Sequence, residues 1–440
     1  MKNFLHTAFR ELLDIYGDKV EYVRENTILK KHAIYFDWTA SGLANQIIEN
    51  RIAEILPYYA NTHSIASKHA FLIQELYKES KNVIRKSLGL SEDFVLLACG
   101  SGATGAIKKF QELLGIYIPP QAKKYVNIKK QELPLVVVGA FEHHSNEISF
   151  REGLCEVYRI PLCDDFSFDL IDFEKTLKKN KHRRIIVSCN VLSNVTGNRA
   201  PIEKISTIAR KYGCIIALDM ATSSVDISID SSYFDACFLS PHKLIGGVGS
   251  CGILAIKKEL IDLETSPSFA GGGVVKYVDR KTQIYTTDFE QREEAGTPPL
   301  LQIFRSALVY QMRNEVGLDV IKQKKRILMR VLLKGLREIE GIKIYGGMEH
   351  EGIVSFNIKG ISPFILAHYL SYNYQIQTRA GCSCAGPYGH DLLGLEDGVF
   401  LGEDSQYGWL RVSLHYTHTL FEIEHLLLVL KKLVDLLRVS

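Results

Sequence analysis

The sequence predicts an α/β protein in which a large domain with a mostly parallel sheet is followed by a smaller α+β domain. Between about residues 94 and 256, short apolar or β-branched runs alternate with amphipathic segments, as in βαβ units. After about residue 305 the pattern changes to a long helix, short strand-like runs and further helices. A chain of 440 residues that is 46% hydrophobic is long enough to bury two such cores.

The strand-like runs define the expected domains. They cover residues 94–98, 135–139, 184–188, 215–218, 236–239 and 252–256. We expect residues 36–305 to form the large domain, and residues 1–35 to pack with residues 306–440 in the smaller one, because the chain must return before it enters the sheet. The Lys-rich stretch within residues 116–134 predicts a solvated loop.

Composition narrows the class of partner. A net charge of +3 with dispersed basic residues favours a small-molecule substrate over nucleic acid or an anionic membrane. The N-terminus lacks the features of a secretory signal and no apolar run reaches the roughly 18 residues of a membrane span, so we expect a cytoplasmic protein. Nine scattered cysteines do not form a disulfide framework, and only Cys382 and Cys384 stand in a Gly-rich polar setting where a thiol is accessible.

Chemically capable residues directly follow several predicted strands. They are GSGATG, EHHSN, SNVTGN, the single residue Asp219 and the segment SPHK. Ligands of open α/β sheets bind beyond the carboxyl ends of the strands, so these residues are expected to converge on one site.

Lys243 ends the segment that follows the run 236–239. A lysine at the end of a strand in a cleft is partly desolvated, which lowers the pKa of its amine and suits it to Schiff-base chemistry. The alternative is a surface lysine in a turn, and this segment alone does not separate the two.

Asp219 closes an apolar strand, where an acid is costly unless it is paired. Pyridoxal phosphate requires such an acid beside its pyridine nitrogen, although a helix N-cap is the better explanation of Asp219 taken on its own. The turn GSGATG fits a phosphate held by Ala103 and Thr104 at a helix N-terminus, with ordinary capping as the alternative. It is not a Walker A loop, because Ala106 follows Gly105.

His143 lies at the same expected edge of the sheet, where an imidazole can stack on a pyridine ring. The pair His143 and His144 suggests a metal as the alternative, but neither this pair nor the CxC of residues 382–384 has the usual spacing of a zinc site. We therefore expect no metal. The GxGxxG pattern at residues 247–252 precedes a strand-like run instead of a helix, so it does not indicate a dinucleotide site.

Taken together, GATG, EHHSN, SNVTG, D-x-A, SPHK, EAGTP and R-x-G-x-x-C occur in an order that resembles the class V aminotransferases. The sequence is most similar to the branch of cysteine desulfurases (NifS-like) and selenocysteine lyases, from YFDWTASG to RVSLHYTHT. The resemblance implies the pyridoxal phosphate (PLP) fold-type I, with a seven-stranded sheet, and PLP as the cofactor.

The resemblance also implies roles for individual residues. Lys243 would form the Schiff base and move the Cα proton, His143 would stack on the ring, and Asp219 would pair with its nitrogen. The other expected cofactor contacts are Ala103, Thr104, Asn194, Thr222, Ser240, His242 and, from the second subunit of a homodimer, Thr297.

For the substrate, the resemblance assigns the α-carboxylate to Arg379, with Asn194 and His63 as further contacts. Cys384 would attack the substrate sulfur, which releases alanine and leaves a persulfide for a possible sulfur-acceptor protein. The sequence departs from the family at Thr222, where desulfurases usually have glutamine, and at Cys382, which makes the loop a CxC that could be a redox pair.

Two alternatives remain at this point. The first is a class V aminotransferase, or a C–S or C–N lyase, that acts on another amino acid without a catalytic cysteine. The second is a non-catalytic scaffold of the same fold.

Overall fold

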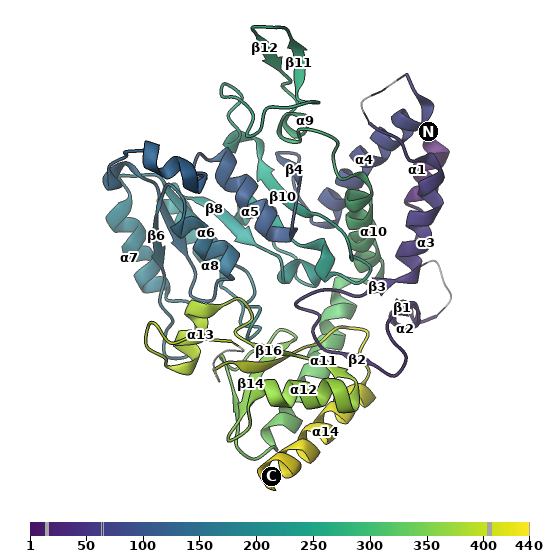
Figure 1. Cartoon of the computed structure of the whole chain (residues 1–440), viewed down its shortest axis with the longest axis vertical. Coiled ribbons are helices and arrows are strands. Elements are labelled where there is room, and N and C mark those ends of the chain that lie inside the picture. The colour runs from purple at the N-terminus through teal and green to yellow at the C-terminus, as the bar shows by residue number, and fades with distance from the viewer. Residues whose placement is uncertain (14–16, 63, 65, 403–406, 440) are drawn as a thin grey trace.

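The fold is that of a computed structural model of the chain (Figure 1). The structure describes residues 1–13, 17–62, 64, 66–402 and 407–439. His63, expected at the substrate, lies outside the described residues.

A seven-stranded sheet forms the centre of the larger unit, in the order β4-β10-β9-β8-β7-β5-β6. Its strands are β4 (Phe94–Cys99), β5 (Leu135–Val138), β6 (Glu156–Arg159), β7 (Ile185–Asn190), β8 (Ile215–Asp219), β9 (Ala236–Leu239) and β10 (Gly252–Lys257). Neighbours from β6 to β9 are parallel, whereas β10 is antiparallel to both β9 and β4. Every strand except β10 therefore ends at the same edge, which confirms the predicted mostly parallel sheet of seven strands.

The strand β6 matches none of the six runs identified along the sequence. It carries Glu156 and Arg159 and its residues are half-buried or exposed, because it lies at the edge of the sheet. An edge strand needs no continuous apolar run, so its pattern is weak.

Alternate side chains of the strands enter two different apolar cores. Leu96 and Val137 belong to one core, while Leu97 and Val138 belong to the other, as the period of two in a strand requires. The first core is covered by α7 (Leu170–Asn180), α8 (Ile202–Lys211) and α10 (Leu300–Val316), and the second by α5 (Gly102–Leu113) and α6 (His144–Arg151). Burial on both faces explains why the central strands read as continuous apolar runs.

A four-stranded antiparallel sheet forms the smaller unit, in the order β13-β14-β17-β16. Its strands are β13 (Ile342–Ile344), β14 (Ile353–Ile358), β16 (Arg379–Gly381) and β17 (Trp409–Ser413). The helices α11 (Leu318–Arg337), α12 (Pro363–Tyr374) and α14 (Leu420–Val439) contribute to its apolar core.

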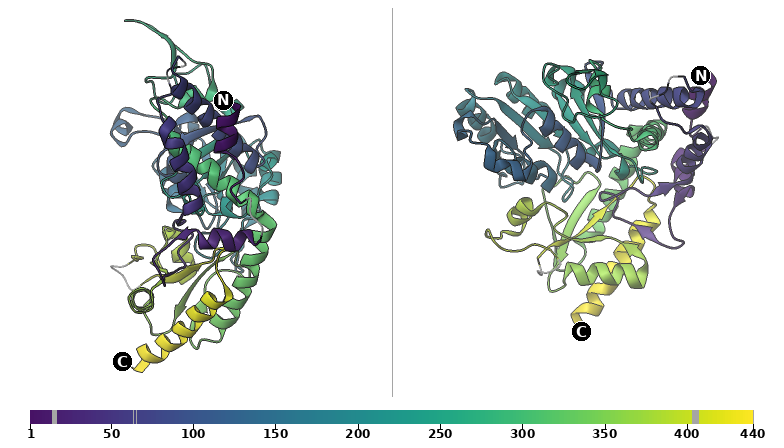
Figure 2. Two further views of the ribbon diagram at one scale, coloured as in Figure 1. Left: turned by 90° about the vertical axis from the view of Figure 1, so that its right-hand side faces the viewer. Right: turned by 45° about the horizontal axis from the view of Figure 1, so that its top comes forward.

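The N-terminal segment divides between the two units, unlike the expectation for residues 1–35. The helix α1 (Lys2–Ala8) contacts α3 (Gln46–Ile55) and α4 (Lys68–Ser87), and Val20 and Val23 of α2 (Lys19–Glu25) lie in the core of the larger unit. The smaller unit is contacted by β2 (Ile34–Tyr35), a parallel partner of β15 (Ile376–Gln377), and by Arg24, which pairs with Glu422 at 3.9 Å. Figure 2 shows the N-terminus beside the larger unit, whereas the C-terminus lies at the far end of the smaller one. The domain boundary near residue 305 stays a prediction.

The free edge of β4 is covered by α9 (Phe289–Glu293) and the residue that follows it. Glu290 accepts a hydrogen bond from the backbone of Leu96 at 2.9 Å, and Glu294 accepts one from Ala98 at 2.7 Å. The buried amine of Lys81 pairs with both carboxylates at 3.0 and 2.9 Å. These contacts satisfy the edge of the sheet and fix the start of the EAGTP segment.

Two exposed excursions complete the chain. The hairpin of β11 (Val275–Val278) and β12 (Gln283–Tyr285) projects from the larger unit at the top of Figure 1 and was not predicted from the sequence. Residues 119–132 are almost entirely exposed, as predicted for the Lys-rich loop. Within the part of the chain that the structure describes, no helix combines the length and apolar character needed to cross a bilayer.

Gly252→Ala is expected to destabilise the larger unit. An added Cβ would lie 1.9 Å from the backbone oxygen of Gly102, so β10 and the Gly-rich turn must separate. We expect the free energy of unfolding to fall by about 1–3 kcal/mol in urea denaturation. Gly272→Ala is the control, because its Cβ would meet no atom within 4 Å. Equal stability of the two variants would show that the packing of Gly252 is unimportant.

Candidate active site

A cavity of about 190 Å3 lies where the carboxyl ends of the strands meet the smaller unit. The predicted residues that line it are Ala103, Thr104, His143, Asn194, Asp219, Thr222, Ser240, His242, Lys243, Arg379 and Cys384. Most of them follow strands of the central sheet, whereas Arg379 and Cys384 come from the smaller unit. The structure thus brings together residues up to 281 positions apart in the sequence, from Ala103 to Cys384.

Lys243 lies in the short turn after β9, with its amine 3.3 Å from the hydroxyl of Thr222. Burial lowers the pKa of this amine to about 8, and the carboxylate of Asp219 opposes part of that shift. A lysine with a lowered pKa has more neutral amine near pH 7 than an ordinary lysine, as a nucleophilic amine requires.

Asp219 ends β8 and is only 3% exposed. Its carboxylate accepts a hydrogen bond from the backbone of Ala221 at 2.9 Å. Burial raises the pKa of Asp219, whereas this hydrogen bond and the charge of Lys243 act in the opposite direction. A buried carboxylate in a cavity is suited to pair with a cation, because it has few other partners.

The Gly-rich turn between β4 and α5 closes one end of the cavity. Gly102 has a φ of 55°, and an added Cβ would lie 2.9 Å from the hydroxyl of Ser240 and 2.8 Å from the ring of His242. Ser240 accepts a hydrogen bond from the backbone of Ala103 at 2.8 Å, and the hydroxyl of Thr104 lies 2.6 Å from that of Ser145. Backbone N–H groups, hydroxyls and a helix N-terminus form the kind of cradle that binds a phosphate.

His143 precedes α6, and its Nδ1 accepts a hydrogen bond from the backbone of Ser145 at 3.2 Å. Burial lowers the pKa of His143 to about 3, and the positive charge of Lys243 acts in the same direction. The ring is therefore neutral at ordinary pH, as a ring that stacks on a planar ligand can be.

The adjacent Glu142 is buried and joins the ends of two strands. Its carboxylate accepts hydrogen bonds from the backbones of Gly139 at 3.0 Å and Asn190 at 2.9 Å, and from the side chain of Asn146 at 2.7 Å. Burial raises the pKa of Glu142 to about 8. Glu142 thus fixes the backbone that positions His143.

The cysteine loop follows β16 and is anchored to the larger unit. The backbone N–H of His144 donates to the carbonyl of Cys384 at 2.8 Å, and the His144 ring accepts from Gly386 at 2.7 Å. The side chain of Asn194 donates to the carbonyl of Ser383 at 2.7 Å. Ser383 and Cys384 have positive φ values of 54° and 58°, so the loop holds two consecutive residues in the left-handed region.

The sequence analysis missed Arg411, a buried arginine on β17 opposite Arg379 that also lines the cavity. Arg411 forms an ion pair with Asp37 at 2.6 Å and donates to the carbonyl of Asn194 at 2.9 Å. A charged residue inside the apolar run WLRVS was the available signal, because a buried charge requires a partner.

Thr297 does not line the cavity of its own chain. It is exposed in the segment after α9, and its assignment to the site of a second subunit stays a prediction. Thr222, the departure from the family pattern, contacts the amine of Lys243 instead.

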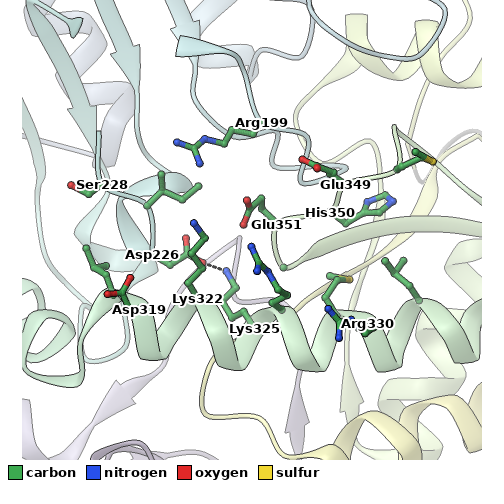
Figure 3. Close-up of a pocket in the computed structure, with 17 residues that line it drawn as sticks. Arg199, Asp226, Ser228, Asp319, Lys322, Lys325, Arg330, Glu349, His350 and Glu351 are labelled. Atoms are coloured by element: carbon green, nitrogen blue, oxygen red, sulfur yellow. Dashed lines mark hydrogen bonds and ion pairs between the residues drawn. The ribbon is translucent and has the colours of Figure 1, made fainter. Parts of the chain in front are cut away.

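A larger groove of about 670 Å3 lies between α11 and the segments that carry Arg199, Asp226 and Glu351 (Figure 3). None of the predicted site residues lines this groove. It contains the ion pair of Lys325 and Asp226, and Arg199, Lys322 and Glu351 also line it. The predicted chemistry therefore belongs to the smaller cavity.

Comparison with known proteins agrees with this architecture. The family model for aminotransferase class V matches residues 34–426. A probable cysteine desulfurase of Pyrococcus abyssi is 29% identical over 431 residues, which cover 96% of this chain and 99% of that protein. A cysteine desulfurase of Synechococcus elongatus is 25% identical over 97% of this chain and 65% of its own length.

Solved structures show the same fold. The apo structure of a cysteine desulfurase from Thermococcus onnurineus superposes with a TM-score of 0.79 and 26% identity, covering 94% of this chain and 98% of that one. The cysteine desulfurase CsdA from Escherichia coli superposes with a TM-score of 0.76 and 19% identity, covering 96% of this chain and all of the other. The central sheet is thus that of fold-type I, as the sequence resemblance implied.

Glu142→Gln is expected to change how stability depends on pH. The folded pKa of about 8 lies above the ordinary value of 4.5, so wild type loses stability as the pH rises through this window. The variant lacks this loss. As the pH rises, the free energy of unfolding of the variant should therefore increase relative to that of wild type, by up to about 1.4 kcal/mol per pH unit.

Urea denaturation at several pH values between 5 and 8 measures this difference. Glu92→Gln is the control, because Glu92 is exposed and its variant should follow wild type across the range. A constant difference between Glu142→Gln and wild type would contradict the raised pKa of Glu142.

Proposed function

The chain belongs to the aminotransferase class V family, and from this membership we propose that it is a PLP-dependent cysteine desulfurase. It would convert L-cysteine into L-alanine and retain the sulfur as a persulfide on Cys384. The observation that carries the proposal is the presence of Lys243, Asp219, Arg379 and Cys384 around one cavity.

The residues of the cavity fit PLP. The Gly-rich turn with Ser240 and His242 offers a phosphate cradle at one end, and Asp219 offers a buried carboxylate for a protonated ring nitrogen. The side-chain oxygen of Asn194 is buried and accepts no hydrogen bond from the described residues, so it is available to a ligand donor. When bound, PLP supplies an electron sink for the carbanion that forms at the substrate Cα.

Each residue of the cavity has a task that follows from its surroundings. Asp219 would hold the ring nitrogen of PLP in its protonated form, because its carboxylate is buried in the cavity. His143 is neutral and presents a flat ring to the face of the cofactor. Lys243 would attach the cofactor through its amine, and its pKa of about 8 suits that amine to accept the Cα proton of the substrate.

Arg379 would bind the α-carboxylate of the substrate through its planar guanidinium. Arg411 lies beside it, but its contacts with Asp37 and the carbonyl of Asn194 assign it to positioning. This leaves Arg379 as the arginine of the pair that is available to substrate.

Cys384 would supply the nucleophile. Its thiolate attacks the sulfur of the substrate, the bond between that sulfur and Cβ breaks, and the electron pair passes to the substrate carbon. The persulfide remains on Cys384 and protonation of the carbon yields alanine. Lys243 and Arg411 line the same cavity as Cys384, so the sulfur lies among cationic side chains.

The wider assembly is part of the same proposal. Thr297 is exposed and outside the cavity of its own chain, which supports a homodimer in which it completes the other site. A sulfur-acceptor protein would remove the persulfide sulfur from Cys384, and the enzyme would act in the cytoplasm.

The cofactor is tested first. Protein reconstituted with PLP is expected to be yellow, and borohydride should bleach it and fix the cofactor to Lys243, as peptide mass spectrometry can show. Lys243→Ala should bind PLP without this covalent attachment. Protein that stays colourless and takes up no PLP would favour the scaffold.

The nucleophile is tested with Cys384→Ser. We expect the release of alanine and sulfide from L-cysteine, with a thiol reductant present, to fall by on the order of 100-fold or more. PLP absorption should be unchanged. Cys382→Ser is the control and should retain activity within a few-fold, because Cys382 does not line the cavity.

Undiminished desulfuration by Cys384→Ser would exclude the persulfide mechanism. A product assay with a panel of amino acids would then distinguish an aminotransferase from a lyase of the same family.

A further inference from the structure

A second, much smaller cavity lies behind the amine of Lys243. Its volume is about 20 Å3, enough for one water molecule. Its polar lining residues are Trp38, Thr39, Thr222, Lys243, Lys325 and His415. It shares Thr39, Thr222 and Lys243 with the active-site cavity, so the two lie on either side of the lysine.

His415 is fully buried and one of its ring nitrogens lacks a partner. Thr417 approaches Nδ1 with its hydroxyl at 2.7 Å and its backbone N–H at 3.4 Å. A backbone N–H can only donate, so Nδ1 is the acceptor and the neutral ring carries its proton on Nε2. Nε2 is buried and has no hydrogen-bond partner among the described residues.

Trp38 lines the same cavity and stacks on His415, with ring centroids 3.8 Å apart and planes inclined by 11°. Its Nε1 is a second buried donor without a partner among the described residues. Trp38 also borders another cavity of about 310 Å3, so its Nε1 is not specific to the small cavity. The argument for a water molecule therefore depends on His415. An unpaired buried donor costs about 1–3 kcal/mol, so a filled cavity is favoured.

We propose that this cavity binds one water molecule that accepts a hydrogen bond from Nε2 of His415 and donates one to the amine of Lys243. His415 is thus a positioning residue, which acts on the lysine through the water.

The direction of the hydrogen bonds follows from the lining. The available donors are Nε2 of His415, Nε1 of Trp38 and the ammonium of Lys325, one more than the two hydrogen bonds that a water oxygen can accept. The hydrogens of the water are left for acceptors, which are the hydroxyls of Thr39 and Thr222 and the lone pair of the neutral Lys243 amine. The water therefore stabilises the neutral form of Lys243.

The charges around the two groups act in known directions. Burial lowers the pKa of His415, and His418 and Lys325 act in the same direction, so its ring is neutral. The charged and titratable groups around Lys243 are Asp219, Arg411, Cys384 and Asp37, and Lys325 lines the same small cavity.

The cavity and the groove of Figure 3 share one lining residue. Lys325 lines both, and its ion pair with Asp226 forms part of the partition between them. The water would therefore lie between the lysine and this ion pair.

A matched pair of variants tests the role of His415. In His415→Asn the side-chain amide can replace Nδ1 toward Thr417 but nothing replaces Nε2. In His415→Gln the longer side chain places an amide N–H near the former Nε2. Both variants lose the stacking on Trp38, so their thermal stabilities should be similar.

The readout is the pKa of Lys243 in the protein free of cofactor, from the pH dependence of its acetylation measured by peptide mass spectrometry. His415→Asn should raise this pKa by about 0.5 to 1, because one hydrogen bond to the neutral amine is lost. His415→Gln should stay close to wild type. A crystal structure of the wild type should show an ordered water between His415 and Lys243.

The proposal is overturned if wild-type crystals show no water in the cavity, or if the two variants shift the pKa of Lys243 equally. The proposed function is needed only for the further step that the pKa of Lys243 affects catalysis. Both readouts use protein without cofactor, so failure to bind PLP or to desulfurate cysteine would leave them interpretable.

Discussion

The burial of the Lys243 amine, opposed by the carboxylate of Asp219, is the constraint on which the site depends. Burial alone would lower the pKa of an amine far, and a buried carboxylate alone would be costly. Both groups line the same cavity, and the opposing effects of burial and of the Asp219 carboxylate give the amine a pKa of about 8. The parallel sheet produces this balance, because β8 and the turn after β9 end at the same edge.

The site also requires that Arg379, Arg411 and Cys384 of the smaller unit lie opposite that edge of the sheet. Arg379 and Arg411 are paired across β16 and β17, and the ion pair of Arg411 with Asp37 neutralises one of the two guanidinium groups. The cysteine loop is held against α6 by His144. A side chain of the larger unit therefore positions the loop of the smaller one, and the position of Cys384 depends on the contact between them.

Buried carboxylates also support the strand ends around the site. Glu142 satisfies backbone N–H groups of Gly139 and Asn190, while Glu290 and Glu294 satisfy those of the edge strand β4. The two arrangements differ in charge. The pair at β4 is balanced by Lys81, whereas burial raises the pKa of Glu142 to about 8 and no cation among the described residues pairs with it.

The parallel sheet and the polar residues that follow its strands could be predicted from the sequence alone. Apolar runs buried on both faces read directly as strands, and polar residues that follow such strands must meet at one edge. The sequence could not reveal β6, the division of residues 1–35, or the roles of Arg411 and His415. Those depend on which side chains from distant segments become neighbours, and a buried polar residue discloses its partner only in the folded chain.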